Sequence, residues 1–222
     1  MKKILIITLA VIALLAAGCN KANNSNNSND SEYGTSTEAS MQKSEAELAL
    51  RQDMRKLWTD HVLWTREYIV AAALNAPHAQ TAAARLLKNQ EDIGNAVAKY
   101  YGTDAGNKLT ALLKEHINLA VAVTADAKAG DTAKFNADND KWKQNGNDIA
   151  DFLASANSNW PQATLRNMMA KHLSLLTSQV TDNLNKKYDA SIADFDAGLD
   201  HILMMADALS DGIIKQFPDK FE

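Results

Sequence analysis

The chain has 222 residues, of which 46% are hydrophobic, and its 27 acidic side chains outnumber its 23 basic ones. This length and composition suffice for one folded domain with a substantial core. The sequence contains no basic stripe and no basic amphipathic face. These absences argue against nucleic acid, and against an anionic lipid surface, as direct partners of the folded part.

The start of the chain is typical of an export signal. A basic opening (MKK) is followed by an apolar run over residues 4–17, and then by Gly18 and Cys19. A basic start, a short apolar stretch and small residues before a cut are the parts of a secretory signal peptide. A membrane-spanning helix needs about 20 apolar residues, so this run is short for a permanent span. We therefore predict that residues 1–18 are a signal peptide.

Residues 15–19 (LAAGC) resemble the lipobox of bacterial lipoproteins, although Ala16 stands where that family more often has Leu. The resemblance implies cleavage before Cys19, attachment of a diacylglycerol to its thiol, and a place on the outer face of the cell membrane. The alternative is an ordinary signal peptide with a chance cysteine. Cys19 is the only cysteine of the chain, so no disulfide is predicted.

Residues 19–43 are predicted to be a tether. The stretch from Asn20 to about Ser40 is rich in Asn, Ser, Thr, Lys and Glu. It has almost no apolar surface to bury and should stay disordered. A coil of about 20 residues would hold the folded part within a few nanometres of the bilayer. Without the signal peptide, 21 basic and 27 acidic residues leave a net charge near −6.

Residues 44–222 are predicted to form one all-α domain. The composition changes there to Ala, Leu, Lys, Asp and Met with helical periodicity, and no stretch alternates like a strand. Gly102 and Gly130 sit where left-handed caps would end helices, and Pro77 and Pro161 mark further breaks. We expect an antiparallel helical bundle built from repeated hairpins. Its helices are predicted at about residues 44–75, 78–101, 104–129, 132–156, 161–184 and 187–216.

Three histidines occupy inward positions on these predicted helices. His61, His116 and His172 each lie on an apolar face with helical spacing. In the third helix that face is Leu109, Leu112, His116, Leu119 and Val123. Each imidazole should therefore lie in the interior of the bundle.

The helices that follow the first two histidines share a second pattern, Asn-x-x-Asp-Ile. Its copies are Asn89-x-x-Asp92-Ile93 and Asn145-x-x-Asp148-Ile149. The histidine precedes the asparagine by 28 residues in the first copy and by 29 in the second. The repeating unit is thus a helical hairpin with His on one arm and Asn and Asp on the other. Repeated hairpins stack to bury a common core.

A third and weaker copy is predicted at the C-terminal end. His172 and His201 are again 29 residues apart. In this copy, His201-Ile202 falls where Asp-Ile falls in the other two. The more regular apolar face of the last helix leaves His201 at the edge of that face.

Residues equally far from the turn of an antiparallel hairpin lie side by side, so the sequence predicts one polar layer inside the bundle. Its members are His61, Asn89, Asp92, His116, Asn145, Asp148 and His172. Each unpaired buried group costs about 1–3 kcal/mol, so these groups should satisfy one another or a ligand. Three interpretations stay open. The layer is a hydrogen-bonded network that fixes helix register, a site for a divalent metal such as Zn or Fe, or a pocket for a small polar or organic ligand.

Established signatures of metal sites and catalysis do not accompany this layer. Glu-x-x-His, His-Glu-x-x-His, Cys-x-x-Cys-His and Gly-x-Ser-x-Gly are absent from the sequence. Nothing in the sequence specifically indicates a b-type haem held between two of the histidines. His78 is interpreted as a solvated loop residue. The methionine pairs and the tryptophans are interpreted as core side chains rather than copper ligands or a stacking platform: Met168-Met169, Met204-Met205, Trp58, Trp64, Trp142 and Trp160.

Several short motifs carry a family resemblance. They are LWxxHxxWTR at 57–66, LLxNxxDIG at 86–94, YG at 101–102, KEH at 114–116, WxxNxxDIAxFL at 142–153, HL at 172–173, MMAD at 204–207 and QFPxxF at 216–221. On these motifs the chain resembles a family of bacterial, mainly Bacillus-type, helical-bundle proteins. The resemblance implies an all-helical domain and includes His61, His116 and His172, but not His201. Some members carry the labels acetylglutamate kinase or glycosyltransferase, and the motif of neither chemistry occurs in this chain.

The expected function is that of a surface-tethered lipoprotein whose bundle binds a small ligand or a divalent metal through the buried layer, with no catalytic residues. The alternative is a structural or protein-interaction module in which the layer only fixes helix register. An enzyme is the third hypothesis. The predicted partner is the membrane, through the lipid on Cys19. The sequence names neither the ligand nor the oligomeric state.

Overall fold

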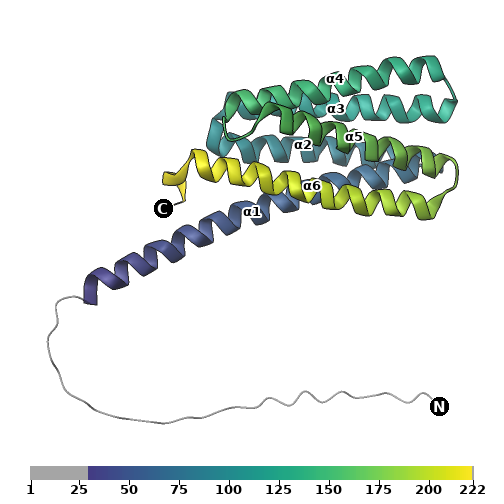
Figure 1. Cartoon of the computed structure of the whole chain (residues 1–222). Coiled ribbons are helices and arrows are strands. Elements are labelled where there is room, and N and C mark those ends of the chain that lie inside the picture. Colours follow the sequence, from purple (N-terminus) through teal and green to yellow (C-terminus); the bar gives the residue numbers. More distant parts are fainter. Residues whose placement is uncertain (1–29, 222) are drawn as a thin grey trace, which may run out of the picture. The chain divides into compact units, whose positions relative to one another are not determined.

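Helices make up nearly all of the chain that the structure describes, which is residues 30–221 of a computed structural model. They are α1 (Asp30–Ala73), α2 (Ala79–Tyr101), α3 (Thr103–Ala129), α4 (Thr132–Ala156), α5 (Gln162–Leu184), α6 (Tyr188–Gln216) and the 3-10 helix η1 (Pro218–Lys220) (Figure 1). No strand occurs in this range, so the predicted all-α class is confirmed. Within the same range, none of the helices has the length and apolar character needed to cross a bilayer.

The turns between helices follow the predicted break points closely. Helices α2 to α6 begin and end within one residue of the predicted bounds. Gly130 ends α3 in the left-handed conformation, with φ 69° and ψ 17°. Gly102, with φ 86°, separates α2 from α3. Side chains rarely adopt such positive φ values, which explains why glycine marks both helix ends.

The first helix begins earlier than the sequence analysis predicts. Residues 30–43, expected to belong to the disordered tether, are the start of α1. Residues 38–49 (EASMQKSEAELA) consist largely of good helix formers, and extending an existing helix needs no new nucleation. From Glu38 onward the chain forms one compact unit, which contains the bundle. The predicted signal peptide, Cys19 and the first part of the tether lie outside the described residues.

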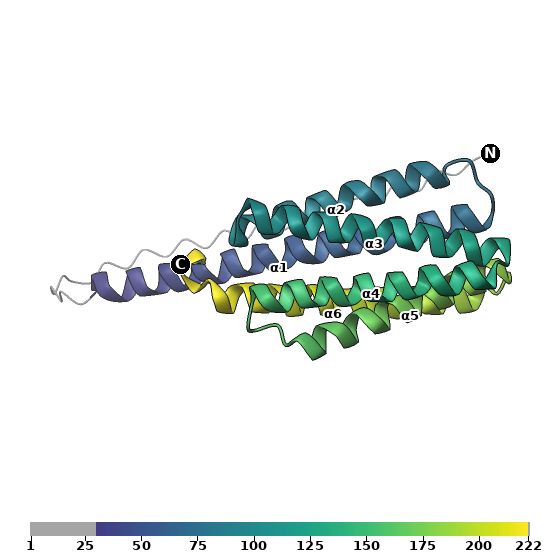
Figure 2. The same cartoon turned by 90° about the horizontal axis from the view of Figure 1, so that it is seen from above.

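The bundle is built from three antiparallel hairpins, α1–α2, α3–α4 and α5–α6, whose helices run lengthwise beside one another (Figures 1 and 2). Each helix from α2 to α5 packs against the next one in the chain. Helix α1 contacts both α2 and α6. Its Leu57 carbonyl accepts a hydrogen bond from α2, and its Arg55 guanidinium binds the Asp207 carboxylate of α6 through two contacts of 2.7 and 2.5 Å.

The apolar core has two parts, one toward each end of the hairpins. The larger part includes Met54, Ile93, Ile149 and Ile202. The smaller part includes Tyr68, Ile69, Val123, Trp142 and Val180. Helices α1 to α5 contribute apolar side chains to both parts, whereas the apolar core residues of α6 belong to the larger part. Buried polar side chains lie where the two parts meet.

Glycines permit close contacts at two places in the bundle. A Cβ added to Gly106 of α3 would lie 2.7 Å from the carbonyl oxygen of Gly94 on α2, so these helices touch backbone to backbone. Gly212 of α6 lies under the indole of Trp160, where an added Cβ would overlap the ring. The Trp160 Nε1 donates to the Ala208 carbonyl of the same helix, at 3.2 Å.

Candidate functional site

Three histidine rings meet at one level in the centre of the bundle. His61 belongs to α1, His116 to α3 and His172 to α5, and they are 2%, 2% and 4% exposed. The ring centroids of His61 and His172 are 5.7 Å apart, and those of His116 and His172 are 6.2 Å apart. The hairpin spacing in the sequence therefore corresponds to a shared level in space, as expected.

The second arm of each hairpin contacts the first arm in the same way. The three hydrogen bonds run from Asn89 Nδ2 to the Leu57 carbonyl (3.0 Å), from Asn145 Nδ2 to the Leu112 carbonyl (3.1 Å) and from His201 Nε2 to the Met168 carbonyl (2.8 Å). Each accepting carbonyl belongs to the residue four positions before the buried histidine. His201 therefore corresponds to the two asparagines, and its predicted match with the two aspartates is wrong.

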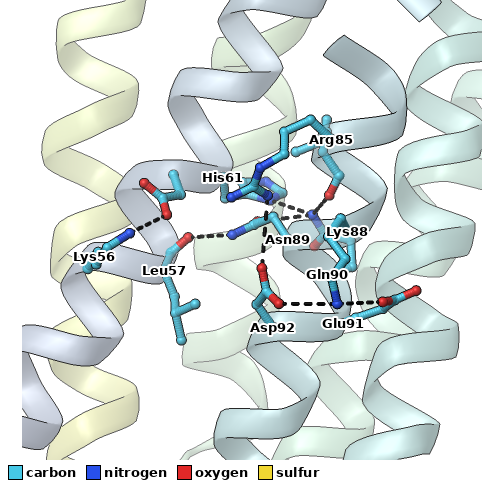
Figure 3. Close-up of polar contacts among 11 residues, drawn as sticks. Lys56, Leu57, His61, Arg85, Lys88, Asn89, Gln90, Glu91 and Asp92 are labelled. Atoms are coloured by element: carbon cyan, nitrogen blue, oxygen red, sulfur yellow. Dashed lines mark hydrogen bonds and ion pairs between the residues drawn. The ribbon is translucent and has the colours of Figure 1, made fainter. Parts of the chain in front are cut away.

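A residue that the sequence analysis did not select, Gln90, completes the first hairpin's part of the layer (Figure 3). Its side chain is fully buried, and its Nε2 lies 3.3 Å from His61 Nδ1. The same Nε2 donates to the Leu86 carbonyl at 2.8 Å and to Asn89 Oδ1 at 3.2 Å. The repeat pattern gave no signal for Gln90, because the equivalent position of the second hairpin is Gly146.

The two aspartates of the repeat lie outside the layer, which corrects the prediction for Asp92 and Asp148. Asp92 is 36% exposed and faces Lys88 and Arg85 at 3.5 and 3.9 Å (Figure 3). Asp148 is exposed and accepts from Gln144 at 2.8 Å. With 3.6 residues per turn, a step of three residues ends about 60° away from the starting face. The isoleucine that follows each aspartate, four positions after the asparagine, is buried instead.

The hydrogen bonds of His116 determine which of its ring nitrogens is free. Its Nδ1 lies 2.8 Å from Asn145 Oδ1. Because the Asn145 amide nitrogen already donates to the Leu112 carbonyl, Oδ1 accepts and His116 Nδ1 carries the proton. The neutral ring then has its lone pair on Nε2, and this buried nitrogen has no hydrogen-bond partner.

Burial keeps all three histidines of the layer neutral. Loss of solvent, followed by the charge of His116, lowers the pKa of His61 to about 3. Burial lowers the pKa of His116 to about 4, against the opposing effect of Asn145. Burial, then the charges of the neighbouring histidines, holds the pKa of His172 well below 6.5. Neutral imidazoles are available as hydrogen-bond acceptors or metal ligands at neutral pH.

Two small cavities flank the histidine layer along the bundle axis. The threonine cavity has a volume of about 20 Å³ and is lined by His61 and His116 together with Thr65, Thr124 and Thr177. The methionine cavity has the same volume and is lined by all three histidines together with Met168, Met169 and Met205. Because about 10–15 Å³ suffices for one water molecule, each cavity has room for a single occupant of that size.

Two tryptophans lie beside the layer, as the interpretation of these residues as core anchors expects. The Trp58 ring makes an edge contact with His61 at 5.5 Å, and the Trp142 ring lies 5.4 Å from His116. Both indole nitrogens are buried without a hydrogen-bond partner. Trp64 instead lies at the surface of the core, with the Arg85 guanidinium 5.4 Å from its ring centroid.

The methionine pairs are divided between core and surface. Met169 and Met205 belong to the larger apolar core, which confirms their prediction as core side chains. Met168 is partly buried against that core. Met204 is 49% exposed, so its prediction as a core side chain is wrong. His78 is exposed, as expected, and its Nε2 lies 2.9 Å from Glu67.

The donor chemistry of the layer differs from that of common divalent-metal sites. No Asp or Glu lines either cavity. Among the side chains that the structure describes (residue 41 and residues 43–221), no three from His, Cys, Asp or Glu are placed so that they could hold a metal ion. The layer and the side chains beside it provide neutral imidazole, carboxamide and indole groups, and several of their polar atoms lack hydrogen-bond partners.

The chain matches no protein-family model, no curated protein and no solved structure with which it was compared. The resemblance to the Bacillus-type helical family stays a prediction.

Proposed function

We propose that this protein is a lipoprotein, held by lipid on Cys19 at the outer face of the cell membrane, whose bundle is a non-catalytic binding module. Its binding site is the buried layer of His61, Asn89, His116, Asn145 and His172. The signal-like start and the lipobox-like residues 15–19 support the location. The geometry around His116 supports the binding function.

The observation that carries the binding function is the unpaired Nε2 of His116. This nitrogen is a buried acceptor without a partner, and its ring borders two cavities. A buried polar group without a partner costs about 1–3 kcal/mol. An occupant that offers a hydrogen-bond donor or a vacant coordination position would remove this cost. Stabilisation by such an occupant is what distinguishes a binding site from a purely structural layer.

A specific observation also favours the structural alternative. The three hydrogen bonds to the Leu57, Leu112 and Met168 carbonyls recur at matching positions of the three hairpins. Such contacts fix how far one arm slides along the other, because any other register leaves buried polar groups unpaired. Register alone accounts for Asn89, Asn145 and His201. It does not account for His116 Nε2.

The test is to purify the full-length lipoprotein in detergent from its native membrane and identify what is bound. Native mass spectrometry and elemental analysis should detect one small molecule or ion per chain. His116→Leu should remove the bound species, whereas the exposed control His78→Leu should retain it. Two results together would favour the structural alternative over this proposal. The first is that nothing co-purifies with the wild type or raises its melting temperature. The second is that His116→Leu strongly destabilises the protein by leaving Asn145 without its partner.

A further inference from the structure

The methionine cavity brings together more potential metal donors than any motif in the sequence indicates. His61, His116 and His172 enter it from α1, α3 and α5, and Met168, Met169 and Met205 enter it from α5 and α6. The six residues are spread over 145 positions of the chain, from 61 to 205. The arrangement exists only after the hairpins have packed together.

The volume of the cavity limits its occupant to a very small species. About 20 Å³ accommodates one water-sized particle. A sugar, an amino acid or a nucleotide has many times this volume. A single metal ion, with donor atoms drawn in around it, fits the space that the side chains leave.

The lining determines which class of ion suits the cavity. Thioether sulfur is a soft ligand that selects Cu(I), and imidazole nitrogen also binds copper. No carboxylate lines the cavity to balance the charge of a divalent ion, and the penalty for burying a charge increases with its magnitude. Trp58 also lines the cavity, and an aromatic face attracts a cation within about 6 Å.

The predicted location favours methionine over cysteine as the sulfur donor. Outside the cell membrane, pairs of thiols oxidise to disulfides. A thioether forms no disulfide, so methionine keeps its sulfur available there. The single cysteine of this chain lies in the lipobox-like segment and not in the bundle.

We propose that the methionine cavity binds one soft monovalent metal ion, of the Cu(I) class, through His116 Nε2 and methionine sulfur. This assignment rests on the proposed binding function and names its ligand. His116 is the nitrogen donor because its Nε2 is buried and unpaired. The hydrogen bond from Nδ1 to Asn145 orients that lone pair, as a second ring nitrogen does for most metal-bound histidines. Among the side chains that the structure describes, histidine and acidic residues alone form no such site, and the methionine sulfurs lining the cavity are the further donors that this assignment uses.

The test is titration of the full chain with Ag(I), a redox-stable analogue of Cu(I), in a Cys19→Ser background that removes the only thiol. We expect saturable binding of one Ag(I) per chain and a higher melting temperature. Met169→Leu and Met205→Leu should each weaken binding at least about tenfold, because even loss of a supporting partner costs 10–100-fold in metal sites. Leucine nearly matches methionine in volume, so both variants should keep the fold, which circular dichroism checks.

Met204→Leu is the matched control, because Met204 neighbours Met205 in sequence but is 49% exposed. It should bind Ag(I) as tightly as the parent protein. Equal weakening by Met204→Leu and Met205→Leu, or no saturable binding, overturns the assignment. Tighter binding of Zn(II) than of Ag(I) overturns it as well.

Failure of this assignment is distinguishable from failure of the proposed function. If Ag(I) and Cu(I) do not bind while another small molecule raises the melting temperature in a His116-dependent manner, the binding module stands and its ligand is of another class. If neither metal nor any small molecule stabilises the protein, both proposals fall.

Discussion

His116 Nδ1 and Asn145 Oδ1 lie 2.8 Å apart at the buried centre of the bundle, joining α3 to α4. The same asparagine donates to the Leu112 carbonyl at 3.1 Å, so one side chain ties the histidine to its own helix. In the first hairpin Gln90 takes part as well, since its Nε2 lies 3.3 Å from His61 Nδ1 and 3.2 Å from Asn89 Oδ1.

Asn145→Ala should destabilise the protein by about 2–4 kcal/mol. The substitution leaves the His116 Nδ1 proton without a partner in the core, at a cost of about 1–3 kcal/mol. It also removes the side-chain hydrogen bond to the Leu112 carbonyl, which keeps its helical bond from the His116 backbone N–H. The measurement is the free energy of unfolding in urea at neutral pH. Asp148→Ala on the same helix is the control, since Asp148 is exposed, and it should change stability by less than about 0.5 kcal/mol. Similar losses in the two variants would contradict the assigned roles.

Stability should fall as the pH drops from 6.5 to 5. Burial lowers the pKa of His61 to about 3 and of His116 to about 4, and the pKa of His172 also lies well below 6.5. In this range the unfolded chain takes up protons that the folded chain does not, so acid favours unfolding. Each buried histidine should contribute about 1 kcal/mol per pH unit. Urea unfolding of metal-free protein at several pH values measures the slope.

His116→Gln should remove about a third of that slope, because one of three buried titrating groups is lost. His78→Gln should leave the slope unchanged, since the His78 side chain is 54% exposed. A slope that is insensitive to His116→Gln would mean that this ring is protonated in the folded protein.

Much of the bundle was predictable because helix breaks and apolar periodicity are local features of the sequence. Positive φ at Gly102 and Gly130 follows from the place of these glycines after an apolar seam. The shared level of the three histidines was also predictable, because two hairpins with nearly equal spacing stack in one register. These inferences need only the helical period and the positions of the turns.

Other features depend on the direction in which each side chain leaves its helix and on the space available to it. The spacing of residues in the sequence does not specify either. The prediction that Asp92 and Asp148 lie in the layer is wrong because it places residues three positions apart on the same helix face. The inward face continues at the fourth residue instead. The role of Gln90 has no counterpart in the second hairpin, so no repeat indicated it. Division of the methionine pairs between core and surface follows from the twist of α5 and α6, as exposed Met204 beside buried Met205 shows.

Gly212→Ala should destabilise the protein by about 1–3 kcal/mol, the range of forced overpacking in a core. A Cβ at this position would overlap the Trp160 indole, which is held by its hydrogen bond to the Ala208 carbonyl. Gly198→Ala is a matched control in the same helix, because nothing lies within 4 Å of its added Cβ. Alanine exceeds glycine in helix propensity by about 1 kcal/mol, so this control should be slightly more stable than the wild type. Thermal unfolding of both variants gives opposite shifts if the packing at Trp160 is as described.

Cys19→Ser should abolish membrane anchoring without changing the fold. The lipobox-like residues 15–19 predict that the thiol of Cys19 carries the lipid, and serine has no thiol to accept it. Metabolic labelling with an alkyne fatty acid should mark the wild-type protein and not the variant, and the variant should lose its membrane fractionation in detergent-free extracts. Its circular dichroism and melting temperature should equal those of the wild type, because the bundle begins well after this residue. Labelling that persists in the variant would place the lipid elsewhere and remove the basis for the proposed location.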